Sequence, residues 1–126
     1  MRQWLDELEA RTKKFATDAV KFAATLEDVP RCRDAARQLS RAATSVGANH
    51  RAARRVATDR WLAAKLQIVN EEADECVYWL EIIDTGAGLN QEGRRLLRES
   101  RELRAIFATG AATMRKRLRA KQARRS

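Results

Sequence analysis

The C-terminal quarter of the chain carries the side chains best suited to bind a polyanion. Residues 94–126 contain twelve basic and two acidic side chains. Most are arginines, whose planar guanidinium makes bidentate contacts with phosphate. Affinity for nucleic acid grows with the number of such contacts, because each neutralised phosphate releases counterions. The residues expected to contact phosphate are Arg94, Arg98, Arg101, Arg115, Lys116, Arg117, Arg119, Lys121, Arg124 and Arg125. The same pattern is compatible with a solvated helix face followed by a solubilising tail.

A second cluster is acidic and has the side chains to hold a divalent cation. The run Glu71-Glu72-Ala73-Asp74-Glu75 is followed by Glu99 and Glu102. This spacing resembles the metal motif of all-α nucleoside triphosphate pyrophosphohydrolases, although the motif has Asp where this chain has Glu102. Carboxylates at i and i+3 on facing helices are suitable ligands for Mg²⁺. The resemblance implies a Mg-dependent nucleotide hydrolase as an alternative function.

Other catalytic chemistry has few residues available. His50 is the one histidine, and Cys32 and Cys76 have no evident histidine partner that would activate a thiolate. Both cysteines lie among helix-forming residues, which favours a buried, apolar role for them. His50 lies beside Arg51 near a predicted helix end, and we expect it to be structural or solvent-facing. We therefore expect a protein that is not an enzyme, with no catalytic residues, no metal and no cofactor.

Composition narrows the fold class. The 126 residues suit one domain, and 34% charged with 44% hydrophobic residues is too apolar for disorder and too charged for a membrane span. One proline and five glycines argue against a β-sandwich or barrel. The net charge of +9 is uneven, because residues 63–93 contain one basic and seven acidic side chains. Such asymmetry suggests association through charge, within the protein or with a partner.

Periodic apolar residues place the elements that must carry these clusters. Steps of three and four predict helices over 3–26, 31–55, 58–86 and 91–119. Pro30 and Thr58 are suited to helix starts and Gly86 to a helix end. Four such helices with short connections predict an all-α, antiparallel up-down four-helix bundle over residues 1–119. Residues 120–126 form a basic C-terminal tail in this prediction, with fraying expected from Arg115.

Two features of the middle helices break the simple amphipathic pattern. Asn49 lies on the apolar stripe of the second helix, where we expect it to be hydrogen-bonded and, with Ser45, to fix interhelix geometry. Gly47 lies inside the same helix and suggests close approach by another segment. The third helix has a second apolar face that predicts a subunit interface. That face contains Trp61, Ile68 and Trp79.

The second helix also carries a recognisable stretch, Gln38-Leu39-Ser40-Arg41-Ala42-Ala43-Thr44-Ser45-Val46-Gly47-Ala48-Asn49. It resembles the signature of a bacterial four helix bundle family first noticed as reading frames within intervening sequences of 23S ribosomal RNA genes. That family is related to the accessory variability proteins of diversity-generating retroelements. The similarity covers residues 31–58 and continues more loosely to Glu81. It implies a four-helix bundle assembled as a homopentamer, with a basic surface suspected of binding nucleic acid and no established catalysis.

The chain departs from that family just after Asn49. Many members read Asn-Ile-Ala-Glu-Gly, whereas here His50, Arg51 and two alanines follow the asparagine. The second helix loses its acidic residue while the third gains an acidic cluster. We therefore expect Arg41 and Arg51 to pair with carboxylates of the third helix, which would offset their desolvation. The expected carboxylate partners include Glu72 and Glu75.

The sequence as a whole predicts a non-enzymatic, self-associating bundle that presents an Arg-rich surface. The expected partners are further copies of the chain, RNA or DNA, or an acidic protein. The Mg-dependent hydrolase and a pure assembly module remain as alternatives. The N-terminus has no apolar segment typical of a signal peptide, and no apolar run is long enough to span a membrane. We therefore expect a cytoplasmic protein without membrane association.

Overall fold

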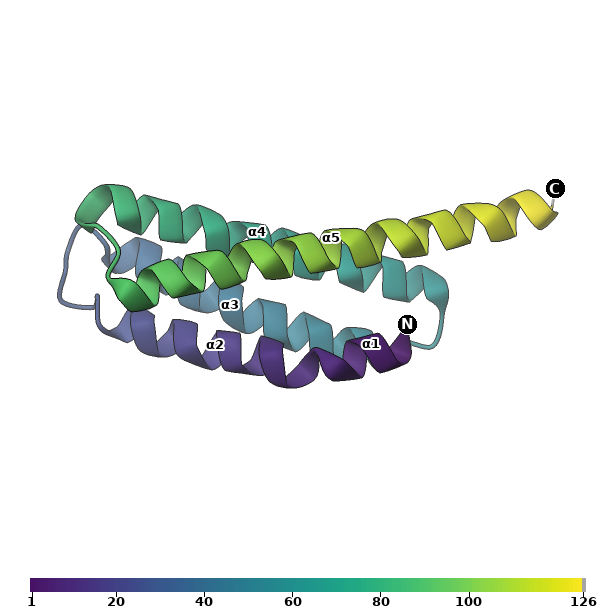
Figure 1. The fold of residues 1–126 in the computed structure, drawn as a ribbon, viewed down its shortest axis with the longest axis horizontal. Helices are drawn as coiled ribbons and strands as arrows, with labels where there is room; N and C mark the ends of the chain where they lie inside the picture. The colour runs from purple at the N-terminus through teal and green to yellow at the C-terminus, as the bar shows by residue number, and fades with distance from the viewer. Residues whose placement is uncertain (126) are drawn as a thin grey trace.

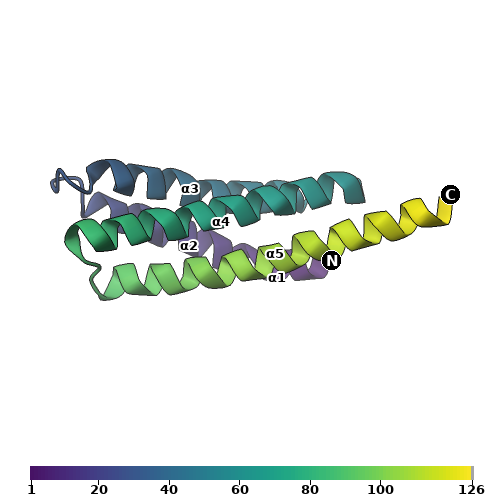
Figure 2. The same cartoon turned by 90° about the horizontal axis from the view of Figure 1, so that it is seen from above.

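A computed structural model describes residues 1–125 as five α-helices without a β-strand in that range (Figure 1). The helices are α1 (Arg2–Glu7), α2 (Glu9–Ala24), α3 (Arg33–Ala53), α4 (Asp59–Ala87) and α5 (Gln91–Arg125). Consecutive long helices run in opposite directions, and α5 lies along the arm formed by α1 and α2 (Figures 1 and 2). This arrangement confirms the predicted all-α, up-down four-helix bundle.

The core is built from the apolar stripes that the spacing predicts. Its largest fully buried side chains include Phe15 of α2, Leu39 of α3, Leu66 of α4, and Leu103 and Phe107 of α5. Burying such side chains is worth about 1.5–3 kcal/mol each, so the bundle rather than helix propensity holds the four arms together. Cys32 and Cys76 are also buried, as predicted, and they do not form a disulfide with each other.

The first arm is broken at Leu8, where the sequence predicts one continuous helix. The N–H of Leu8 donates to the carbonyl of Leu5 at 3.2 Å, a tighter turn than α-helical geometry. Nε2 of His50 lies 2.7 Å from the same Leu5 oxygen. A continuous helix would supply that carbonyl to the N–H of Glu9. At the break between α1 and α2, His50 of α3 therefore takes the place of the Glu9 N–H as hydrogen-bond partner of the Leu5 carbonyl.

The predicted starts of the third and fourth helices are confirmed, whereas their predicted C-terminal ends are wrong. Thr58 caps α4 by accepting from the N–H of Trp61, and Asn90 accepts from the N–H of Gly93. Gly86 lies inside α4, and Gly88 ends it with φ of 77°, a conformation that favours glycine. The predicted fraying from Arg115 is wrong, because α5 continues as a helix to Arg125.

No helix within residues 1–125 combines the length and the apolar character needed to cross a membrane. The long helix α5 ends beyond the other helices, so its last turns project from one end of the bundle (Figure 1). The α2–α3 and α4–α5 connections lie at the opposite end of the molecule (Figure 1).

Candidate nucleic-acid interface

The projecting part of α5 brings the densest group of cations to one end of the bundle. We call residues 115–125 the α5 basic end; its charged residues are Arg115, Lys116, Arg117, Arg119, Lys121, Arg124 and Arg125. All are exposed. Lys121 pairs with Asp59 of α4, and Arg115 donates to Gln67 at 3.1 Å. Within the described chain, the other five make no ion pair, so their charges remain available to solvent or to a ligand.

A hollow of about 650 Å³ lies where the α5 basic end meets the start of α4. Arg60 of α4 faces it together with Lys121 and Arg125 of α5. Asp59 lies at the same place, and its pKa is lowered, first by the hydrogen bond from Lys121 and also by the charges of nearby arginines. Lys121 and the neighbouring arginines therefore favour the charged form of this carboxylate. The sequence did not indicate Arg60, because it belongs to another helix and joins the cluster only through packing.

The N-terminal half of α5 behaves differently, because most of its cations are already engaged. Arg94 donates to the carbonyl of Leu89 at 2.6 Å, and Arg101 pairs with Glu81 of α4 at 3.6 Å. Arg98 is exposed and makes no ion pair among the described residues. The predicted phosphate-binding residues therefore fall into two groups. Arg94 and Arg101 are engaged within the bundle, whereas Arg98 and the α5 basic end are exposed and largely without ion pairs in the described part of the chain.

The predicted polar residues of the second helix lie along the seam between α3 and α4. Nη2 of Arg41 lies 3.1 Å from Glu75, and Nη1 lies 3.8 Å from Glu72. Asn49 donates to Ser45 Oγ at 2.9 Å. These contacts confirm the predicted pairing of Arg41 with carboxylates of the third predicted helix. They also confirm that Ser45 and Asn49 are hydrogen-bonded.

Glu72 occupies an unfavourable position in this seam. Its Oε2 is buried without a hydrogen-bond partner, and its pKa is raised, first by burial and then by the charge of Glu75. Arg41 opposes the shift, but its contact with Glu72 is the longer of its two ion pairs. The seam therefore holds one carboxylate that is only partly compensated.

Two predictions for α3 are wrong: the position of Asn49 on the buried face, and the pairing of Arg51 with carboxylates of α4. Asn49 is half-buried, and His50 takes the buried position with 1% exposure. Arg51 is exposed, borders a groove between α2 and α3, and makes no ion pair with α4. The buried face passes from Val46 to His50 and Ala53 rather than through Asn49, and His50 packs into the core against Phe107 with ring centroids 5.9 Å apart.

The carboxylates required by the hydrolase alternative do not come together. Glu99 and Glu102 face α2, where Arg11 binds Glu99 through two hydrogen bonds of 2.7 and 2.8 Å and also contacts Glu102. Arg11 lowers the pKa of Glu99, chiefly through these hydrogen bonds. Glu72 and Glu75 face α3 instead. Across residues 1–125, no three His, Cys, Asp or Glu side chains are grouped to hold a metal ion.

The predicted interface residues share the outer side of α4, with different degrees of exposure. Trp61 is 64% exposed, whereas Ile68 and Trp79 are half-buried. Nε1 of Trp79 is buried without a hydrogen-bond partner. Tyr78 and Ile82 extend this apolar surface and are exposed, and the sequence reading overlooked both.

The class of protein is therefore a basic, all-helical bundle with one projecting cationic helix end. No protein-family model matches the chain, and no curated protein matches it. Among solved structures, a protein of unknown function from the S23 ribosomal protein family of Bacteroides thetaiotaomicron has the same fold, with a TM-score of 0.75. The two sequences are 24% identical, and the match covers 82% of this chain and 97% of that one. This likeness shows a shared fold.

Proposed function

We propose that this protein is a non-enzymatic, self-associating bundle that binds nucleic acid through the α5 basic end. We further propose that it belongs to the bacterial four helix bundle family, as the Gln38–Asn49 stretch suggests. The fold shared with a protein of the S23 ribosomal protein family supports this assignment.

One observation carries the nucleic-acid proposal: cations on α5 extend past the bundle without intramolecular partners. Several cations elsewhere are neutralised between helices, as with Arg11 and Glu99 or Arg104 and Asp74. Lys116, Arg117, Arg119, Arg124 and Arg125 make no such pair within the described residues. A helix that projects from the protein can follow a groove or a phosphate backbone without steric conflict. Such contacts favour charge-driven binding with little dependence on base sequence.

The test is fluorescence anisotropy with a labelled DNA duplex and a labelled RNA duplex across a salt series. The variant Arg117→Gln/Arg119→Gln/Arg124→Gln removes three charges from the α5 basic end. Each lost phosphate contact lowers the slope of log K against log salt by about 0.9 for DNA, so the slope should fall by about 3.

The matched control removes three charges at the opposite end of the bundle, in Arg31→Gln/Arg33→Gln/Arg37→Gln. Its salt slope should equal that of the wild type. Equal slopes for both variants, or no salt-sensitive binding by the wild type near 50 mM salt, would refute the proposal.

Self-association is the second part of the proposal, with a pentamer as the state expected from the family resemblance. The apolar outer side of α4 supports it, because Trp61, Tyr78 and Ile82 expose large side chains that water solvates poorly. Light scattering measures the mass in solution. A mass of 14.3 kDa, that of one chain, would refute this part.

A further inference from the structure

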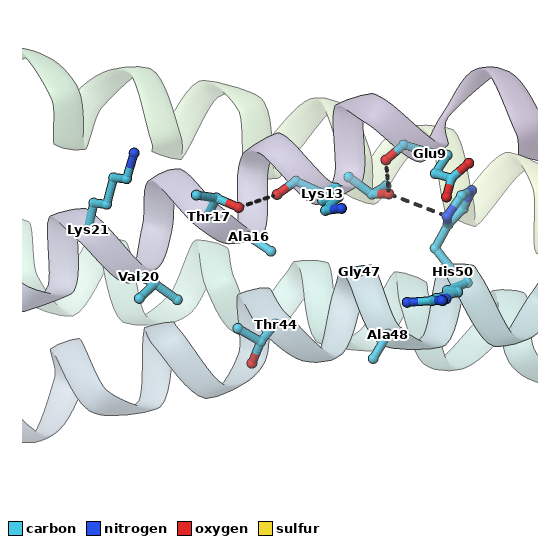
Figure 3. Close-up of a pocket in the computed structure, with 12 residues that line it drawn as sticks. Glu9, Lys13, Ala16, Thr17, Val20, Lys21, Thr44, Gly47, Ala48 and His50 are labelled. Carbon is cyan, nitrogen blue, oxygen red and sulfur yellow. Dashed lines mark hydrogen bonds between the residues drawn. The ribbon is translucent and has the colours of Figure 1, made fainter.

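A groove of about 560 Å³ runs between α2 and α3 on the outside of the bundle (Figure 3). Small side chains line its centre, including Ala16 of α2 with Gly47 and Ala48 of α3. A Cβ atom placed on Gly47 would lie 3.7 Å from that of Ala16. The helices are therefore closely packed beneath the groove, and the small residues leave room for a ridge of side chains from outside.

The rim of this groove carries uncompensated positive charge. Lys13 and Lys21 of α2 and Arg51 of α3 are exposed and make no ion pair among residues 1–125. Glu9 is the one acidic residue of the rim, and it is bound by Arg54 at 2.7 Å. A complementary occupant must therefore be both apolar and acidic.

The outer side of α4 has these properties. Tyr78 is 54% and Ile82 is 40% exposed, and Glu71 lies on the same side without an ion pair in the described part of the chain. Five of the seven acidic side chains in the segment 63–93 are paired with arginines of the same chain, so Glu71 supplies the uncompensated negative charge of this side. We call the side chains of Ile68, Glu71, Tyr78 and Ile82 the α4 ridge.

The two surfaces also agree in apolar character and in length. The described chain exposes four large hydrophobic side chains; Val20 lies in the groove, Tyr78 and Ile82 lie on the α4 ridge, and Trp61 lies outside both surfaces. At 1.5 Å per residue, the α4 ridge from 68 to 82 is about 21 Å long, and the groove from Glu9 to Lys21 is about 18 Å long.

We propose that the α4 ridge of one copy docks into the α2–α3 groove of a second copy. This inference rests on the self-association proposed above and specifies its interface. Since α2 and α4 each pack against α3 and α5, they occupy diagonal corners of the bundle. The groove and the ridge are then different surfaces of each copy, and the contact is heterologous. Contacts of this type form closed rings when the rotation between neighbours closes.

The experiment uses two variants of the full chain, each with one damaged surface. Lys21→Glu/Ala48→Glu fills the groove and reverses part of its charge. Tyr78→Ser/Ile82→Ser removes the exposed side chains of the ridge. All four positions are exposed, so circular dichroism should show wild-type helix content for both variants. Light scattering measures mass for each variant alone and for an equimolar mixture.

We expect each variant alone to have the mass of one chain, 14.3 kDa. The mixture should reach twice that mass and go no further, because one intact groove meets one intact ridge. The control Arg98→Glu/Ala112→Glu makes the same change of charge on exposed positions of α5 and should retain the wild-type mass.

Each alternative gives a different result. A symmetric contact between two α4 helices would leave the groove variant assembled, would abolish assembly of the ridge variant, and would give no complementation; this would overturn the inference. An oligomeric wild type with both variants unaffected would refute the groove–ridge contact but preserve self-association. A monomeric wild type would refute self-association itself. An acidic protein as occupant would leave the wild type monomeric while the groove variant alone loses that partner.

Discussion

His50 ties the first arm of the bundle to α3, and replacing it should weaken the whole fold. Because a carbonyl only accepts, Nε2 donates its proton to Leu5 O across 2.7 Å. In the neutral ring, which burial favours by lowering the pKa of His50, Nδ1 carries no proton and lies 3.3 Å from the hydroxyl of Thr12. The ring is 1% exposed and packs edge-on against Phe107. The neutral, buried imidazole therefore links α3 to the first arm of the bundle by a hydrogen bond and by packing.

Two substitutions separate its packing from its hydrogen bond. His50→Ala removes the ring, leaves a cavity and orphans the Leu5 carbonyl, so the free energy of unfolding should fall by about 2–4 kcal/mol. His50→Gln keeps an amide donor near the position of Nε2 and should cost less, about 1–2 kcal/mol. Urea unfolding followed by circular dichroism measures both, with an unchanged m-value expected for a two-state loss of stability.

The pH dependence gives an independent check on the same residue. Burial is the main cause of a folded-state pKa below the ordinary 6.5, and the charge of Arg54 adds to it. The Leu5 hydrogen bond and the carboxylates of Asp6 and Glu9 act in the opposite direction. The unfolded chain therefore binds a proton more readily, so stability is fully present above pH 6.5 and is lost as the pH falls toward the folded-state pKa.

The slope from this one group cannot exceed about 1.4 kcal/mol per pH unit. Unfolding free energies at pH 7, 6 and 5 should therefore decline in the wild type. His50→Gln should lack this component, since glutamine does not titrate. A parallel decline in both proteins, or a fully stable His50→Ala variant, would refute the account of His50 as a neutral, buried link.

Three further outcomes test the ion pairs and the absent metal centre. In a double-mutant cycle, Arg41→Gln and Glu75→Gln should couple by no more than about 1 kcal/mol because both side chains are largely exposed, and zero coupling in urea unfolding would exclude the pairing. Arg11→Gln should destabilise by about 1–2 kcal/mol at pH 7; because the folded-state pKa of Glu99 is lowered, this difference from the wild type should shrink as the pH falls below 4.5. Millimolar Mg²⁺ should leave the melting temperature unchanged and release no pyrophosphate from nucleoside triphosphates, and a rise in melting temperature that Glu72→Gln abolishes would restore the hydrolase alternative.

Long-range periodicity made the architecture predictable, whereas the exceptions depended on tertiary contacts. The stripes along α3, α4 and α5 were each long enough to mark a buried face. The break at Leu8 has no local signal, because it depends on a histidine 42 residues further along the chain. The helical C-terminus was missed because basic residues suggested a solvated tail, although arginine and lysine are themselves good helix formers.

The candidate site was only partly readable for a similar reason. Arginine density alone identified α5, but it could not separate Arg101, engaged by Glu81, from Arg119, which has no ion pair in the described chain. That distinction depends on which side of α5 faces α4. Small residues such as Ala16 and Ala48 gave no sequence signal of a groove, because alanine on a helix is compatible with core, surface or cleft.

Charge and assembly are linked by the position of the α5 basic end. In a cyclic ring every copy has the same orientation relative to the symmetry axis, so all the projecting helix ends would lie on one face if α5 runs along that axis. Each end alone offers a few phosphate contacts, and its binding is weakened by salt. Several ends on one face would engage a long nucleic acid together, and the effective concentration of the second contact raises avidity without any new type of interaction. The groove–ridge contact would then determine how strongly a weak, sequence-independent site holds its polyanion.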